Sequence, residues 1–82
     1  MTSLALTLSN LPKNTPATVT GFQQGQSELE TRLREIGFAE GDHVQAPHFG
    51  LFGRNPLTVK LNGALIALRR NEAHAVLVEV VG

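Results

Sequence analysis

The chain has 82 residues, 41% of them hydrophobic and 17% charged, which predicts one globular domain over residues 1–82 with no length left for a second. Seven basic and seven acidic residues cancel, which argues against a nucleic-acid partner because such proteins usually carry a basic excess. The absence of cysteine excludes disulfides, thiolate catalysis and cysteine-ligated zinc, and it favours a cytoplasmic location. We expect no signal peptide and no direct membrane insertion, since no segment approaches the ~20 apolar residues of a transmembrane helix.

The first segments of the chain predict an extended arm, a turn and a strand. Leucines alternate with smaller residues over 4–8, which indicates an arm laid across the rest of the fold. In the turn that follows, Asn14 is the residue best able to take a positive φ. Residues 17–22 form the first regular strand.

Residues 27–36 predict the one regular helix. Ser27 and Glu30 have the spacing of a capping box, and Gly37 suits the position just after the last turn. The apolar residues of this segment have the spacing of one helix face: Leu29, Leu33 and Ile36. The capping box, the apolar face and the glycine after the last turn therefore predict the same helix.

The second half of the chain predicts a series of strands. Residues 43–49 form a strand that Pro47 interrupts, so we expect a sheet edge or a bulge there. Residues 56–61 alternate between apolar and polar, and Asn62-Gly63 predicts a type I′ turn that leads into a strand over 64–68.

A corner with one turn of helix over 69–74 and a closing strand over 75–80 complete the chain. The strands at 64–68 and 75–80 are apolar at nearly every position, so we expect both faces of the sheet to be covered. The predicted fold is therefore mainly β: a small, SH3-like, partly open β-barrel with a short α-helix at 27–36 inserted after the first core strand. Such a barrel is filled by its own side chains and leaves no cavity for a substrate.

Five short motifs, in this order, resemble the FeoA family of small cytosolic proteins of bacterial ferrous-iron transport. They run along nearly the whole chain: LSNLP at 8–12, RLREIGF at 32–38, EGDHV at 40–44, NPLTV at 55–59 and ALRRNEA at 67–73. The chain departs from the family where Arg54-Asn55-Pro56 stands in place of a frequent Gly-Asp-Pro, which leaves any role of that aspartate in doubt.

The resemblance implies an SH3-like barrel and a non-enzymatic accessory role in ferrous-iron uptake. The implied partner is the cytosolic region of the membrane transporter FeoB, which would recruit the protein to the inner face of the plasma membrane. The same module occurs at the C-terminus of iron-dependent transcriptional repressors, whose DNA-binding and metal-binding domains are missing from this sequence. In agreement with a non-enzyme, the residues suggest neither a catalytic triad nor a pair of catalytic carboxylates.

Residues 50–55 are predicted to form a glycine-containing loop, and the best candidates for contact with a partner lie in and beside it. They are apolar residues next to an arginine: Phe49, Leu51, Phe52 and Arg54. Exposed apolar groups in such a loop suit protein recognition, either of FeoB or of another copy of the chain. The alternative is that Phe49 or Phe52 folds back and plugs the barrel.

Arg69 and Arg70 are the second candidate, because arginine pairs well with carboxylates of a partner. The alternative, which we favour from the sequence, is an internal bridge from Arg69 to Glu72 that fixes the corner.

The three histidines, His43, His48 and His74, are weak candidates for binding Fe²⁺ or Zn²⁺. His43 and His48 lie on opposite faces of a regular strand unless Pro47 introduces a bulge, and no four-ligand set is evident. We therefore expect no required cofactor, and adventitious metal shared between copies is favoured over a site within one chain. The alternative function is a protein that binds Fe²⁺ or Zn²⁺ directly and changes its oligomeric state in response.

Overall fold

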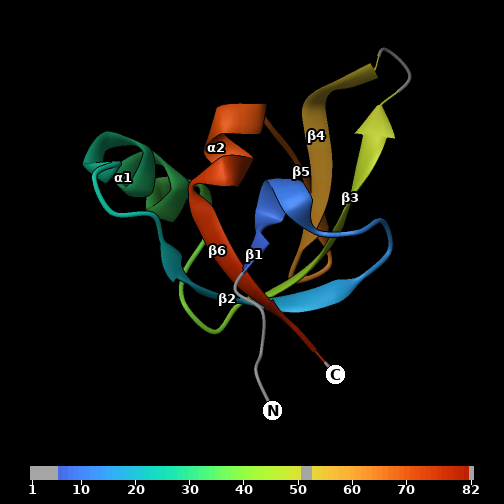
Figure 1. The fold of residues 1–82 in the computed structure, drawn as a ribbon, viewed down its shortest axis with the longest axis horizontal. Helices are drawn as coiled ribbons and strands as arrows, with labels where there is room; N and C mark the ends of the chain where they lie inside the picture. The colour runs from blue at the N-terminus through green and yellow to red at the C-terminus, as the bar shows by residue number, and fades with distance from the viewer. Residues whose placement is uncertain (1–5, 51–52, 82) are drawn as a thin grey trace.

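The computed structural model describes the backbone of residues 6–50 and 53–81, and their side chains apart from 46–50 and 53–56. The elements follow in this order: β1 (Leu6–Thr7), the 3-10 helix η1 (Leu8–Asn10), β2 (Pro16–Phe22), α1 (Ser27–Ile36), β3 (His43–Gly50), β4 (Gly53–Leu61), β5 (Ala64–Leu68), α2 (Arg70–His74) and β6 (Val76–Val80). Figure 1 shows α1 on one side of the molecule, the β3–β4 hairpin reaching away on the other, and α2 between them.

The strands form one antiparallel sheet in the order β1-β6-β2-β3-β4-β5. β1 and β5 are the two ends of this order, so the sheet of the described residues curves without closing. The predicted mainly β, partly open fold with a helix at 27–36 after the first core strand is confirmed.

The core lies against the inner face of the sheet and is apolar. Leu33 of α1, Val59 of β4 and Val78 of β6 are each 0% exposed. On β4 the predicted alternation is confirmed, because Leu57, Val59 and Leu61 are buried while Lys60 is exposed.

Local turn chemistry also follows the sequence. Asn14 has a φ of 60°, as predicted. Asn62 and Gly63 have φ values of 49° and 91°, the paired positive values that a type I′ turn requires. Gly37 follows α1 with a φ of 130°, a conformation that favours glycine.

The predicted bulge at Pro47 is confirmed, since the pairing of β3 with β4 shifts register between Gln45 and His48. β3 is not an edge strand, because it lies between β2 and β4. The predicted loop at 50–55 is wrong in extent: β3 continues to Gly50, β4 begins at Gly53, and these two glycines pair. Pairing with the neighbouring strand here outweighs the local preference of glycine and asparagine for loops.

Two further predictions for the first half of the chain are wrong. The arm is not extended throughout, because η1 follows β1 and turns the chain so that Leu8 and Leu11 are both buried. The capping box of α1 does not form either. Gln26 occupies the N-cap without a side-chain bond, and Ser27 lies inside the helix, where its carbonyl accepts a bond from the Thr31 hydroxyl.

The apolar face of α1 is narrower than predicted. Leu33 is fully buried and Leu29 packs partly against the core, but Ile36 is 41% exposed. The helix ends at Ile36, so this side chain lies at the edge of the contact between α1 and the core and not within it.

The expectation that the strand at 64–68 is covered on both faces is also wrong. Leu65 is 65% exposed, and Ala64 and Ala67 are exposed as well. β5 is the last strand in the sheet order, so it has a partner on one side only. Sequence periodicity could not show this, because it carries no information on strand order.

Candidate functional site

The tip of the β3–β4 hairpin, residues 49–54, carries the first set of predicted partner-binding residues. Phe49 pairs with Leu57 in the sheet, and Arg54 belongs to β4, but the side chains of both lie outside the described part of the structure. Leu51 and Phe52 lie outside the described residues altogether. Figure 1 shows that β3 and β4 reach away from α1. The role of the hairpin tip in partner binding therefore stays a prediction.

The second predicted set, Arg69 and Arg70, lies at the start of α2. Arg69 is the N-cap residue in an extended conformation, Arg70 begins the helix, and both are exposed. The predicted bridge between the side chains of Arg69 and Glu72 is not among the ion pairs of the described residues; instead, the backbone N–H of Arg69 donates to Oε1 of Glu72 at 2.8 Å. A glutamate at the third helical position caps the helix in this way without engaging the arginine side chain.

The ionic partner of Glu72 is Arg32 of α1, which the sequence did not indicate. Nη1 of Arg32 lies 3.7 Å from Oε2 of Glu72, whose side chain is only 11% exposed, whereas that of Arg32 is 65% exposed. Glu72 thus connects the two helices. A pair with one exposed member contributes at most ~1 kcal/mol, so the cap is the larger part of this residue's role.

A second cluster, centred on Arg34, holds α1 to the loop that follows it. Its guanidinium donates two bonds to the Glu40 carboxylate, at 3.0 and 2.9 Å, and one to Glu30 at 3.0 Å. It also lies over the ring of Phe22, 4.6 Å from the centroid. The bonds from Arg34 lower the pKa of Glu40, and the bonds to Glu40 and Glu30 raise the pKa of Arg34. The sequence analysis missed this cluster, although the i,i+4 spacing of Glu30 and Arg34 is a signal that could have indicated part of it.

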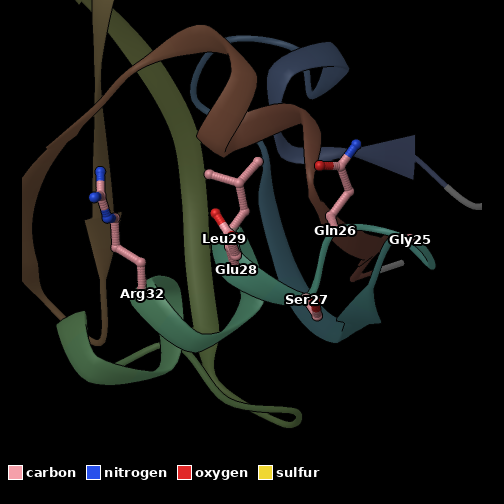
Figure 2. A pocket seen from close by; sticks show the side chains of 6 residues that line it. All are labelled: Gly25, Gln26, Ser27, Glu28, Leu29 and Arg32. Atoms are coloured by element: carbon pink, nitrogen blue, oxygen red, sulfur yellow. The ribbon is translucent and has the colours of Figure 1, made fainter.

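A hollow of about 370 Å³ lies at the beginning of α1 (Figure 2). Its lining is mostly polar: Gly25, Gln26, Ser27, Glu28, Leu29 and Arg32. Figure 2 shows Gln26 and Arg32 at opposite ends of this hollow, with Glu28 and Leu29 between them. The ionisable lining residues, Glu28 and Arg32, have opposite charges.

The histidines stand in different parts of the fold. His43 begins β3 and is exposed, His48 pairs with Thr58 beyond the bulge, and His74 ends α2. The side chain of His48 lies outside the description. Among the side chains that are described, no group of three or more histidine, cysteine, aspartate or glutamate residues could hold a metal ion.

One contact of His74 was not anticipated. Its Nδ1 lies 3.5 Å from Oγ of Ser9, which in turn lies 2.8 Å from Oγ1 of Thr7. The longer distance is at the limit of a hydrogen bond, and the serine hydroxyl has a closer partner in Thr7. The contact links η1 to α2 and is not the geometry of an activated nucleophile.

Residues 6–80 match the family model of the FeoA domain. The chain belongs to the FeoA family. The resemblance carried by the five sequence motifs is thus confirmed, and with it the link to ferrous-iron transport. No curated protein sequence matches the chain. No helix in the described ranges has the length and apolar character to cross a membrane.

Solved structures of the family have the same fold. FeoA of Stenotrophomonas maltophilia, solved with zinc, is 39% identical over 89% of this chain and 88% of that one, with a TM-score of 0.74. It is described as a prokaryotic SH3 domain protein, which agrees with the predicted SH3-like architecture. FeoA of Chlorobium tepidum is 30% identical over 94% of this chain and 71% of that one, with a TM-score of 0.76.

A manganese-dependent transcriptional repressor shares the fold alone. It is 17% identical, with a TM-score of 0.82, and the match covers 98% of this chain but 38% of the repressor. The barrel thus occurs as one part of a larger regulatory protein as well.

Proposed function

We propose that this protein is a non-enzymatic accessory of bacterial ferrous-iron uptake that binds the cytosolic region of the transporter FeoB. The observation that carries the proposal is membership of the FeoA family over residues 6–80. The relative from Stenotrophomonas maltophilia, described as a potential activating factor of bacterial ferrous iron transport, supports an accessory role. The protein then works in the cytoplasm, and its partner brings it to the inner face of the plasma membrane.

The proposed docking surface is the hairpin tip, together with Arg69 and Arg70. The tip combines two phenylalanines, a leucine and an arginine, the residue types that dominate many protein interfaces. The two arginines at the start of α2 are exposed and can meet carboxylates of the transporter.

The proposal is tested by capture of the protein on the purified cytosolic region of FeoB, together with ferrous-iron uptake by cells. We expect Leu51→Asp and Phe52→Ala to weaken both capture and uptake. Val81→Asp is the matched control, because it replaces another apolar residue, 53% exposed, just after the end of β6. If the folded tip variants bind and support uptake as the wild type does, the hairpin tip is not the docking surface. If the wild type is not captured, FeoB is not the partner.

A second candidate function is a direct response to Fe²⁺ or Zn²⁺ that changes the oligomeric state. The zinc complex of the 39% identical relative favours it. His43, His48 and His74 are the ligands to substitute, and a site shared between copies fits their separate positions better than a site within one chain. Calorimetry with Fe²⁺ under anaerobic conditions and with Zn²⁺ tests it. Absence of binding at micromolar metal, or binding unchanged in the three alanine variants, contradicts it.

A further inference from the structure

β5 is an unprotected edge of the sheet. Edge strands usually carry charged residues, proline or a bulge that prevent pairing with another chain. β5 has the sequence Ala64-Leu65-Ile66-Ala67-Leu68, which contains none of these, and it pairs with β4 without a register shift. Leu65, 65% exposed, is the most exposed large apolar side chain among the residues that the structure describes.

The hairpin register shows which backbone groups of β5 are free. In a two-residue hairpin, the residues that flank the turn, here Leu61 and Ala64, exchange hydrogen bonds, and bonded positions then alternate along the strands. Ala64, Ile66 and Leu68 therefore bond to β4, while the N–H and C=O groups of Leu65 and Ala67 point outward. Within the described ranges, neither of these two residues has another hydrogen-bond partner.

We propose that a second copy of the chain pairs with this edge, antiparallel, through its own β5, with the two-fold axis at Ile66. In this register Leu65 lies opposite Ala67 of the second copy, and Ala67 opposite its Leu65. The two pairs use every outward group of β5 and form about four hydrogen bonds, two in each pair. An axis at Leu65 would place Ala67 opposite Gly63, whose φ of 91° is outside the strand conformation. An axis at Ala67 would place Leu65 opposite Arg69, which lies beyond the end of β5.

The side chains and charges also fit this register. Each exposed Leu65 lies beside a small alanine, so the outer faces of the two strands complement each other in size. The nearest charge on this face, Lys60 of β4, is opposite Leu65. Three strand spacings separate the two copies of Lys60, about 14 Å, which exceeds the ~8 Å screening length at physiological salt.

The contact is small, and this determines how the dimer is detected. Two five-residue strands bury less than the ~1,200 Å² of a standard stable interface, so the association is weak and concentration-dependent. Amide hydrogen exchange, followed residue by residue by NMR on the wild-type protein, is the appropriate measurement. Exchange is compared at roughly 50 μM and 1 mM protein. If the dissociation constant is near 0.2 mM, mass action slows exchange at Leu65 and Ala67 about threefold at the higher concentration. Ile66 and Leu68 bond to β4 in both states and are the internal controls.

A pair of variants separates this edge from other surfaces. Ala67→Lys places a charge on an exposed edge position, and we expect it to abolish the concentration dependence of exchange and of the sedimentation coefficient. Thr20→Lys, at an exposed position of β2, leaves both unchanged. Exchange at Leu65 and Ala67 that is fast at both concentrations, or slow at both, overturns the proposal. Self-association that persists in Ala67→Lys would show that the copies associate through another surface, and it would overturn the proposal. Slowing of exchange that is seen only when the FeoB cytosolic region is added would show that the edge binds FeoB and not a second copy, and it would overturn the proposal too.

Discussion

Glu72 joins α2 to α1, because one oxygen of its carboxylate accepts the Arg69 N–H at 2.8 Å and the other lies 3.7 Å from Arg32. This residue is 8% exposed and stands in the corner that connects β5 to β6. The same corner presents Arg69 and Arg70 at the surface. Its geometry therefore determines how a proposed part of the docking surface is displayed.

Replacement of Glu72 separates the cap from the ion pair. Glu72→Ala leaves the Arg69 N–H without its acceptor and is expected to lower the free energy of unfolding by about 1–2 kcal/mol. Glu72→Gln keeps an acceptor oxygen and removes only the charge, so its cost is expected to stay below ~1 kcal/mol. Urea unfolding followed by circular dichroism measures both. Equal losses in the two variants would mean that the ion pair, and not the cap, is the important interaction.

Leu33 and Ile36 were predicted from the sequence to lie on one buried face of α1, and they differ in the structure. Leu33→Ala removes a fully buried side chain and is expected to cost about 2–5 kcal/mol, a large part of the stability of a small domain. Ile36→Ala, at a position that is 41% exposed, is expected to cost less than ~1 kcal/mol. Urea unfolding of Leu33→Ala, Ile36→Ala and the wild type measures both losses of stability. A loss in Ile36→Ala as large as in Leu33→Ala would show that Ile36 is covered in solution.

The features predicted correctly from the sequence depend on residues close to one another in the chain. The helix at 27–36 was predicted from apolar residues at helical spacing and from the glycine after the last turn. The turn at Asn62-Gly63 was predicted from two residues that tolerate positive φ. The bulge at Pro47 follows from one missing backbone donor. In each case the physical cause is complete within a few residues.

The features that were missed depend on contacts between distant segments. The exposure of β5 is a consequence of its last place in the sheet order, and the pairing of Arg32 with Glu72 requires that α1 and α2 meet. For the candidate site, apolar composition suggested the hairpin tip, which stays a prediction because its side chains lie outside the described part of the structure. The acceptor of the Arg69 N–H became evident only from the position of the Glu72 carboxylate.

The pair of Arg34 and Glu40 predicts a dependence on pH. The Arg34 guanidinium holds the pKa of Glu40 below its usual range in the folded state. Stability from this pair is therefore fully present above the unfolded-state pKa of Glu40 and is lost as the pH falls through the lower, folded-state value. We expect Arg34→Met to raise the pKa of Glu40 towards its usual range, whereas Arg34→Lys, which keeps the charge but cannot form the two parallel bonds, restores part of the shift.

An NMR titration of the Glu40 carboxyl carbon between pH 2 and 7, carried out on the wild type and on both variants, measures these pKa values. A Glu40 pKa that is the same in the wild type and in Arg34→Met would show that the two side chains do not bond in solution.

Asn62 has two roles in the β4–β5 hairpin, and one substitution removes both. Its side-chain Oδ1 accepts the His43 N–H at 3.0 Å, and its backbone has a φ of 49°. Asn62→Ala removes the acceptor and places a Cβ-bearing residue without a compensating side-chain bond in the left-handed region, so it is expected to cost about 1–3 kcal/mol. Asn62→Asp keeps an acceptor and tolerates the same φ, and it is expected to stay within ~1 kcal/mol of the wild type.

Thermal and urea unfolding of the two variants measure these losses of stability. If Asn62→Asp loses as much stability as Asn62→Ala, neither the bond to His43 nor the turn conformation explains the role of this residue. If both variants are as stable as the wild type, the hairpin that positions β5 does not depend on it.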